Sequence, residues 1–302
     1  MAGEITRDRR DAWAARRTIA ISRVDDPADL RRLLAAEGAN AAYHLSYLQP
    51  DRLGRLRAYA ARLEERHALA VHSRGGLGAA TLLAGDEKLV AALLRLHPGP
   101  RHTLLTCDPD YAQTALSVYH LWRPQVMLRM QLDPAAFAPP DTPMPLRPLG
   151  RDDARDLNRL YALEGDGIWY SSRQIEDGLY FGADVRGQIV AAAGTHTYST
   201  SEGVAVVGNV FTHPDFRIRG LATAVTAAVT AHLVESCRLI VLNVDPANRG
   251  ARRVYERLGY RETGRVLEAM ATRRYPYSPL PLLDRLLARR RGATPGVEII
   301  PA

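Results

Sequence analysis

Apolar and polar positions along this chain switch repeatedly between helical and strand spacing. From residue 26 to 66, apolar residues recur at helical spacing, which predicts two helices. HALAVHS (67–73) and LGAATLLAG (77–85) alternate or run apolar around a glycine turn, the pattern of a β-hairpin. The first half then continues with a helix at 87–96, a strand at 101–108, a helix at 109–122 and a strand at 125–132.

The second half of the chain repeats this order of elements. Its patterns predict a strand at 145–149, a helix at 151–164, a hairpin over 180–199, a strand at 204–212, a helix at 218–236, a strand at 238–244, a helix from Asp245-Pro246 to Gly259 and a strand at 261–270. DPDYAQTALSVYHLW in the first half parallels DPANRGARRVYERLG in the second. The repeated order indicates duplication of one α/β unit.

Proline marks the middle of the chain. The segment DPAAFAPPDTPMP (133–145) has little periodicity, as expected at a domain boundary. The 302 residues, of which 46% are hydrophobic, suffice for two separate cores. We therefore predict one domain over 1–143, a second over 144–272 and a basic C-terminal extension over 273–302.

Charge is distributed unevenly. The net charge is +7, and twelve arginines lie between Arg249 and Arg291 against four acidic residues. A phosphate-rich ligand suits this field, as do RNA and a solvated arginine face. The segment LPLLDRLLARRR is amphipathic and basic enough to touch a membrane surface or nucleic acid, although a docked terminal helix with a solvated tail is the preferred interpretation. No aromatic stacking platform accompanies it, so nucleic acid is not the expected partner.

The two cysteines, Cys107 and Cys237, do not belong to any Cys/His cluster. The sequence therefore predicts no disulfide framework and no metal site. No stretch reaches the roughly 18 consecutive apolar residues of a membrane span, and the first residues carry charges where a signal peptide is apolar. We expect a cytoplasmic protein without a membrane span, and the sequence gives no prediction of its oligomeric state.

The segment 208–223 runs from a buried strand through a turn directly into a helix. A helix start presents unpaired backbone N–H groups and the positive end of the helix dipole, so it binds a pyrophosphate readily. Gly220 allows the backbone to approach a ligand closely, and small Ala222 leaves room for it. Arg217 and Arg219 supply charge-assisted bonds. Taken alone, the pattern also fits an ordinary strand-to-helix turn with exposed arginines.

This turn, Arg217-Ile-Arg-Gly-Leu-Ala222, resembles the Q/R-x-x-G-x-G/A signature of the GNAT superfamily of acyl-CoA-dependent N-acetyltransferases. A second motif, Asn248-x-x-Ala251-x-x-x-Tyr255 followed by ERLGY, resembles a later helix of that family, in which an asparagine meets the cofactor and a tyrosine stands near its sulfur. Without the first motif, Tyr255 would fit a core aromatic. The resemblance covers about 145–270 and implies a mixed α/β GNAT fold.

The resemblance implies acetyl-CoA as the cofactor and transfer of its acetyl group to a primary amine of an unidentified small molecule or peptide. In the family, two central strands splay apart and the pantetheine arm inserts between them; the matching strands here are 204–212 and 238–244. Tyr255 is implied as the acid that protonates the leaving thiolate. The implied cofactor-binding residues are Val210, Phe211, Thr212, Arg217, Ile218, Arg219, Gly220, Leu221, Ala222, Thr223, Asn243 and Asn248.

The general base departs from the family pattern. Many members carry a glutamate on the strand before the turn, whereas 204–209 contains no carboxylate. His196, on the neighbouring strand, is a substitute by side-chain type, although a buried structural histidine fits the same position. Glu164 and Asp166 are candidates for lining the acceptor pocket, with solvated loop carboxylates as the alternative.

The N-terminal half lacks the R-x-x-G-x-G/A signature. Its nearest candidate, Arg74-Gly-Gly-Leu-Gly-Ala79, has Leu77 where glycine is required and lies at a hairpin tip. The whole chain therefore resembles tandem GNAT proteins with one degenerate repeat, and more loosely the subgroup related to glycine N-acyltransferases. A non-catalytic acyl-CoA-binding or regulatory module is the alternative to an enzyme. The missing glutamate favours this alternative slightly, and the presence of Tyr255 and Asn248 opposes it.

Overall fold

A computed structural model of the chain describes residues 18–75, 78–140, 144–163, 165, 169–292, 294 and 296–301. They form two compact units, each assembled from separate stretches of sequence. Unit 1 holds the described residues within 1–36, 55–125 and 267–302, and unit 2 those within 37–54 and 126–266. Where sequence domains begin and end stays a prediction, because each half of the chain contributes residues to both units.

Unit 1 is built on a mixed sheet in the order β13-β1-β2-β3-β4-β5-β12. The strands are β1 (Thr18–Val24), β2 (Leu56–Leu63), β3 (Arg66–Gly75), β4 (Gly78–Gly85), β5 (His102–Cys107), residues 267–273 of β12 (Arg261–Arg273) and β13 (Val297–Pro301). Only β4 and β5 run parallel among these pairs. A parallel pair requires a crossover connection, and the helix α5 supplies it.

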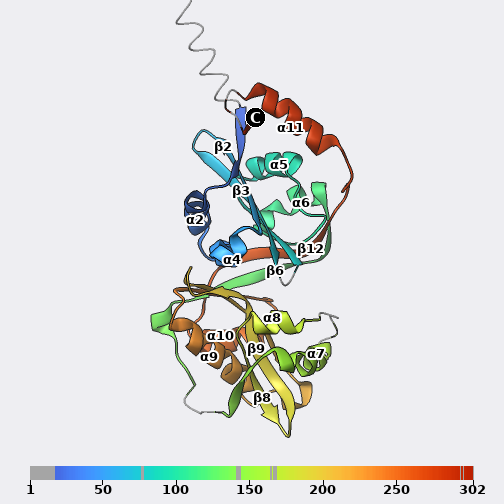
Figure 1. The fold of residues 1–302 in the computed structure, drawn as a ribbon. Helices are drawn as coiled ribbons and strands as arrows, with labels where there is room; N and C mark the ends of the chain where they lie inside the picture. The colour runs from blue at the N-terminus through green and yellow to red at the C-terminus, as the bar shows by residue number, and fades with distance from the viewer. Residues whose placement is uncertain are drawn as a thin grey trace, which may run out of the picture. The chain divides into compact units, whose positions relative to one another are not determined.

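The helices of unit 1 are α2 (Pro27–Ala36), α5 (Glu87–Leu96), η3 (Pro109–Tyr111), α6 (Ala112–Val118) and α11 (Leu280–Arg291). Helix α5 carries the core, because it is apolar on several sides and buries Leu89, Leu93 and Leu96. These side chains pack with residues of β3, β5 and β12 in one cluster. Figure 1 shows α11 along the outside of this unit, beside α5.

Unit 2 has a mixed sheet in the order β6-β11-β10-β9-β8-β7. Its strands are residues 126–132 of β6 (Tyr119–Leu132), β7 (Leu146–Leu149), β8 (Tyr180–Val185), β9 (Gln188–Ser199), β10 (Val204–Thr212) and β11 (Leu239–Val244). Again one pair is parallel, β10 with β11, and the remaining pairs are antiparallel. Apart from β13, the two units therefore share one strand order, as the repeated sequence order predicts.

The helices of unit 2 are η1 (Gly38–Ala41), α3 (Ala42–Leu45), η2 (Ser46–Leu48), α4 (Pro50–Leu53), η4 (Pro134–Ala136), η5 (Arg151–Asp153), α7 (Ala154–Ala162), α8 (Ser172–Glu176), η6 (Pro214–Phe216), α9 (Leu221–Val234) and α10 (Arg249–Arg257). In Figure 1, α9 and α10 lie on one side of β8 and β9, and α7 and α8 lie on the other. The sheet is thus covered on both faces, by separate apolar clusters.

Each sheet is completed by a strand from the other half of the sequence. In unit 2, β6 pairs with β11 from Ile240↔Leu132 to Val244↔Leu128. In unit 1, β12 pairs with β5 from Leu267↔Cys107 to Thr272↔His102. The two halves of the sequence therefore cannot be separated without removing a strand from each sheet.

The helix predicted to extend through residue 66 is wrong. Residues 56–63 form strand β2, which pairs with β1 on one side and β3 on the other. Its sequence, LRAYAARL, consists of good helix formers, but strand pairing outweighs that weak preference. The helix predicted over 109–122 likewise ends at Val118, where β6 begins.

Candidate functional site

The parallel strands β10 and β11 separate part-way along their length. They pair only from Val204↔Leu239 to Val207↔Leu242. Beyond this point β10 continues to Thr212 beside β9, and β11 continues to Val244 beside β6. Beyond Val207 and Leu242, the backbone N–H and C=O groups of β10 and β11 that face each other form no hydrogen bonds in the β10–β11 ladder. They are therefore available to an extended ligand.

A β-bulge lies on β10 where the separation begins. The register with β9 shifts between Gly208 and Phe211, and Asn209 has a left-handed backbone with φ of 55°. A non-glycine residue in this region is uncommon and costs energy unless its surroundings fix it, although asparagine tolerates it better than most residues. The bulge is therefore a conformation that neighbouring groups have to hold.

Three tyrosine hydroxyls hold Asn209. The Tyr170 hydroxyl donates to its side-chain Oδ1 at 2.7 Å, and its Nδ2 donates to the Tyr180 hydroxyl at 2.7 Å. The Tyr161 hydroxyl donates to its backbone oxygen at 2.8 Å. Burial raises the pKa of Tyr180, which therefore stays protonated at neutral pH. Neither the amide nor this phenol serves as a base, so the group fixes the bulge rather than taking a proton.

The imidazole of His196 covers the same place on the sheet. A Cβ built on Gly208 would lie 2.1 Å from the His196 Nε2, so only glycine leaves room for the ring. The side chain is exposed, yet the protein atoms around it lower its pKa to about 4 by desolvation. His196 is therefore neutral at pH 7, in the form that accepts a proton.

Helix α9 begins at Gly220 without a side-chain cap. Gly220 has φ of 78°, and a Cβ built on it would meet nothing within 4 Å. The first N–H groups of a helix have no partner within the helix, and here the space beside Gly220 is open at the positive end of the helix dipole. The turn before the helix, from Arg217 to Gly220, is exposed throughout.

The two arginines of this turn fold back onto the residues that precede it. The Arg217 Nε donates to the Thr212 backbone oxygen at 3.3 Å, and an Arg219 Nη2 donates to the Asp215 backbone oxygen at 3.0 Å. Their guanidinium groups lie over the rings of Phe211 and Phe216 respectively. Both charges thus stay close to the uncapped helix start without a carboxylate partner among the described residues.

Helix α10 supplies Asn248 and Tyr255, which differ in their surroundings. The Asn248 Oδ1 caps the helix by accepting from the Ala251 N–H at 3.0 Å. Tyr255 is 7% exposed and lies in the cluster that contains Leu221 and Val225 of α9. Its hydroxyl has no hydrogen-bond partner in the described part of the chain, and burial raises its pKa to about 12. Tyr255 therefore carries a proton that no protein group uses.

The separated strands and the helix start fit a ligand with an extended amide arm and phosphates. Besides the open cradle at Gly220, the buried Oγ1 of Thr212 has no hydrogen-bond partner among the described residues. A buried polar atom without a partner is costly, and a bound ligand would satisfy it. Asn243, which is half-buried, lies on β11 just beyond the last β10–β11 pair.

Unit 1 lacks an uncapped helix start at α5 and a bulge on β4, the counterparts of the features seen in unit 2. The Asp86 side chain caps α5 by accepting from the backbone N–H groups of Lys88 and Leu89. It fills the place of an anion with its own carboxylate. Strand β4 pairs with β3 without a shift as far as Gly85, so it has no bulge. The predicted candidate turn from Arg74 to Ala79 includes residues 76 and 77, which lie outside the described residues.

Comparison with known families points to the same part of the chain as the candidate site. Residues 150–260 match the family model described as the acetyltransferase (GNAT) family. The chain carries a GNAT domain. The match contains the separated strands, the uncapped helix and α10, and the family generally uses acyl-CoA. The predicted superfamily is confirmed for these residues, and the family supports acyl transfer as the general class of reaction.

Solved structures resemble the chain in fold. A protein from Novosphingobium aromaticivorans assigned to the GNAT family is 22% identical, with a TM-score of 0.50 over 73% of this chain and 89% of its own. A Drosophila protein is 17% identical, with a TM-score of 0.56 over 82% and 88%. No curated protein matches the sequence. These likenesses establish the fold alone, and the predicted two-domain GNAT fold is confirmed.

The N-terminal half of the sequence also reaches the sheet of the GNAT domain. In unit 2, Ala42 of α3 packs with Val206 and Val241. The Ser46 hydroxyl lies 2.8 Å from the Thr197 hydroxyl, to which an Arg52 Nη1 donates at 3.1 Å. Segment 37–54 therefore covers the strands beside His196. No motif in its sequence signals this role.

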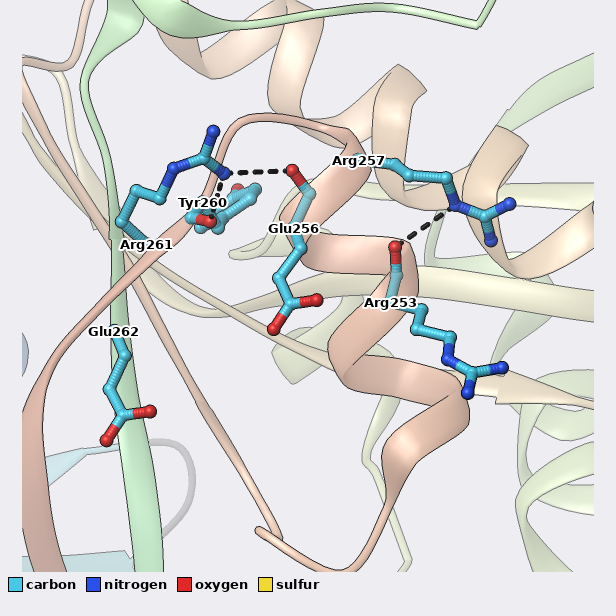
Figure 2. A pocket seen from close by; sticks show the side chains of 6 residues that line it. All are labelled: Arg253, Glu256, Arg257, Tyr260, Arg261 and Glu262. Atoms are coloured by element: carbon cyan, nitrogen blue, oxygen red, sulfur yellow. Dashed lines mark hydrogen bonds between the residues drawn. The ribbon is translucent and has the colours of Figure 1, made fainter.

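A surface depression of about 600 Å³ lies on α10 and the strand that follows. Figure 2 shows its lining residues, Arg253, Glu256, Arg257, Tyr260, Arg261 and Glu262. Positions 253 and 257 are each two residues from Tyr255, which places them on the opposite side of the helix. The depression thus faces away from the core side of α10. Glu164 and Asp166, predicted to line the acceptor pocket, lie outside the described residues.

Replacing Asn209 by alanine is expected to lower the free energy of unfolding by about 2 to 4 kcal/mol. The change removes two side-chain hydrogen bonds, leaves two tyrosine hydroxyls without them, and puts alanine in a left-handed conformation. Urea unfolding measures the effect. Asn209→Gly is the control, because it loses the same bonds but tolerates the backbone and should lose less. Equal stability of Asn209→Ala and the wild-type protein would contradict the role of the tyrosine group.

Among the described residues, no helix is long and apolar enough to cross a membrane.

Proposed function

We propose that unit 2 binds acetyl-CoA and transfers its acetyl group to a primary amine of a small molecule or peptide. The observation that carries this proposal is the combination of an uncapped helix start at Gly220 with the separation of β10 and β11 beyond Val207. The first offers N–H groups to a pyrophosphate, and the second offers backbone groups to the pantetheine amides. Val210, Thr212 and Asn243 are the proposed contacts along the arm.

Acetyl-CoA, when bound, supplies an activated thioester. The backbone at the bulge polarises the thioester carbonyl, with the tyrosine group holding it in place. This thioester would be open to attack by an amine, and Tyr255 would hold the proton that the departing sulfur needs. Burial raises the pKa of Tyr255 to about 12, so the hydroxyl keeps its proton at neutral pH until the reaction occurs.

His196 is the proposed acceptor of the amine proton, directly or through water. It lies over Gly208, beside the start of the separation, and it is neutral at pH 7. A neutral imidazole of low basicity does not take a proton from a free ammonium ion, because the ammonium ion is a much weaker acid than the imidazolium ion that would form. It does suit the nitrogen of an attacking neutral amine, whose acidity rises as the new bond forms.

If His196 is the base, His196→Gln should lower kcat/KM by about 10²-fold at pH 7. In the wild-type enzyme, kcat/KM should be insensitive to this group at neutral pH and fall only below its ordinary pKa of 6.5, because a base is lost on protonation. The variant should lack that acidic limb. Exposed His232 on α9 provides the matched control, and its glutamine variant should keep both activity and profile. An unchanged rate in His196→Gln would assign the ring a structural role.

Unit 1 is proposed to bind no acyl-CoA, because Asp86 closes the start of α5 and β4 lacks a bulge. The N-terminal half is proposed to close one side of the acceptor site through segment 37–54, which packs on β9 and β10. The acceptor role of the N-terminal half cannot be tested by deleting residues 1–143, since this would remove β6 from the sheet of unit 2. It can be tested by substitutions on the exposed surface of segment 37–54, with the KM for the amine as the measured quantity.

A non-catalytic acyl-CoA-binding module is the second candidate. The observation in its favour is Asn209, an amide at the bulge of a strand without any carboxylate. Thiol release from acetyl-CoA, measured with amino acids, polyamines, aminoglycosides and peptides, separates the two. Amine-dependent release that Tyr255→Phe suppresses supports the enzyme. Tight acetyl-CoA binding without release for any amine supports the binding module.

A further inference from the structure

Helix α11 docks on unit 1 with its polar side. The Arg95 Nε of α5 donates to Asp284 at 2.8 Å, and the Arg289 Nε donates to Glu298 of β13 at 3.1 Å. Only Ala288 of this helix is buried, one turn beyond Asp284. Positions four apart share a helix face, so this polar side is the one turned to the protein. The helix is therefore inverted relative to an ordinary amphipathic surface helix.

The outward side of α11 is rich in leucine. Leu282, Leu283, Leu286 and Leu287 are each about half exposed, at 53%, 50%, 49% and 53%. Leu280 at the start of the helix is 65% exposed, and the tyrosines just before it, Tyr275 and Tyr277, are 73% and 82% exposed. Single exposed leucines are common, but a contiguous group marks an interaction surface. We call these seven residues the leucine face.

Positive charge accompanies this face. At 100° per residue, Arg290 falls between Leu283 and Leu286 on the outward side, and Arg291 follows at the end of the helix. Neither arginine has an ion-pair partner among the described residues. Two acidic residues take part in the docking of α11, Asp284 and Glu298. Each of them already forms an ion pair with another arginine, Arg95 and Arg289 respectively. The outward side thus combines leucine, tyrosine and uncompensated arginine.

We propose that the leucine face of α11 binds the surface of an anionic phospholipid membrane. Leucine enters the acyl region, tyrosine suits the interface, and arginine pairs with lipid phosphates, so each residue type has a place there. A nucleic acid would engage the arginines but leave the leucines in water. A second copy would bury the leucines but add like charges.

The test uses the full chain in flotation with phospholipid vesicles. Binding is expected to vesicles of phosphatidylcholine with phosphatidylglycerol, to be much weaker with phosphatidylcholine alone, and to decrease as NaCl is added. Leu282→Ser with Leu286→Ser, and separately Arg290→Glu, should each reduce partitioning by about tenfold or more. The control is Arg186→Glu in the β8–β9 turn, which changes net charge equally and should have little effect.

Several outcomes overturn the proposal. They are absence of binding to the anionic vesicles, binding that salt does not weaken, and equal loss in the Arg186→Glu control. Unchanged binding of the leucine variant overturns it as well, provided that its circular dichroism and melting match the wild-type protein. Light scattering adds a further outcome: a dimer that the leucine substitutions convert to a monomer would identify a second copy as the occupant.

Discussion

Replacement of Gly220 by glutamate is expected to weaken acetyl-CoA binding at least about a hundredfold, or nearly 3 kcal/mol. The glutamate carboxylate would reach the N–H groups at the start of α9 and compete with the pyrophosphate for them. It would also place a negative charge where the ligand brings its own. The helix would keep its fold, because the space around this position is open. Titration calorimetry measures the dissociation constant.

The matched control for that experiment is Gly220→Ala. It carries the same backbone penalty as the glutamate, since both are non-glycine residues at φ of 78°, but it adds no charge. Alanine should therefore cost binding only severalfold, and thermal melting should be similar for the two variants. Unchanged affinity in Gly220→Glu would remove the phosphate end of the proposed site. Equal losses in both variants would attribute the effect to backbone strain.

The second large effect is expected for Tyr255→Phe, which should lower kcat by about 10²-fold or more. The substitution removes one hydroxyl whose proton has no partner among the described residues, and it keeps the ring in the core. The affinity for acetyl-CoA should stay nearly constant, because the proton transfer occurs only during the reaction. Steady-state thiol release gives kcat, and calorimetry gives the affinity.

Tyr260→Phe is the control for the loss of a buried phenol. Tyr260 lies against Tyr255 with ring centroids 6.1 Å apart, but its hydroxyl bonds to the Thr230 hydroxyl at 3.0 Å. Its loss should reduce stability by about 1 kcal/mol and leave kcat nearly unchanged. If both variants lowered kcat equally, the effect would come from packing of α10. An unchanged kcat in Tyr255→Phe would make Tyr255 a core residue.

The part of the site that the sequence predicts is local in the chain. The strand β10, the turn at Arg217 to Gly220 and helix α9 are continuous, so apolar spacing, a glycine and a helix start suffice to place them. The helix α10 follows for the same reason, with Asn248 at its cap. In the structure these segments meet in one apolar cluster, as the two motifs together imply.

The parts that the sequence does not predict depend on contacts between distant positions. The hydroxyls of Tyr161, Tyr170 and Tyr180 meet Asn209 from elements that are 29 to 48 residues away. The exchange of β6 and β12 depends on strand pairing, which composition does not encode. The helical interpretation of 56–63 failed because local preference was the only available signal, and pairing on both edges overrides it.

The orientation of α11 also depends on contacts between distant positions, so the sequence does not predict it. Its amphipathic pattern predicts that the leucines face the protein, as the preferred interpretation of a docked terminal helix requires. The structure turns them outward, while Asp284 and Arg289 pair with residues of α5 and β13. A pattern in sequence identifies an apolar face but not the surface that covers it.

A crystal structure of the acetyl-CoA complex tests the central claim most directly. The account predicts one molecule per chain, with its pyrophosphate at the N–H groups following Gly220 and its pantetheine arm between β10 and β11. The Thr212 hydroxyl should gain a partner, and the thioester sulfur should lie near the Tyr255 hydroxyl. Acetyl-CoA bound instead at α5 of unit 1, or in the arginine-lined depression beside α10, would contradict it.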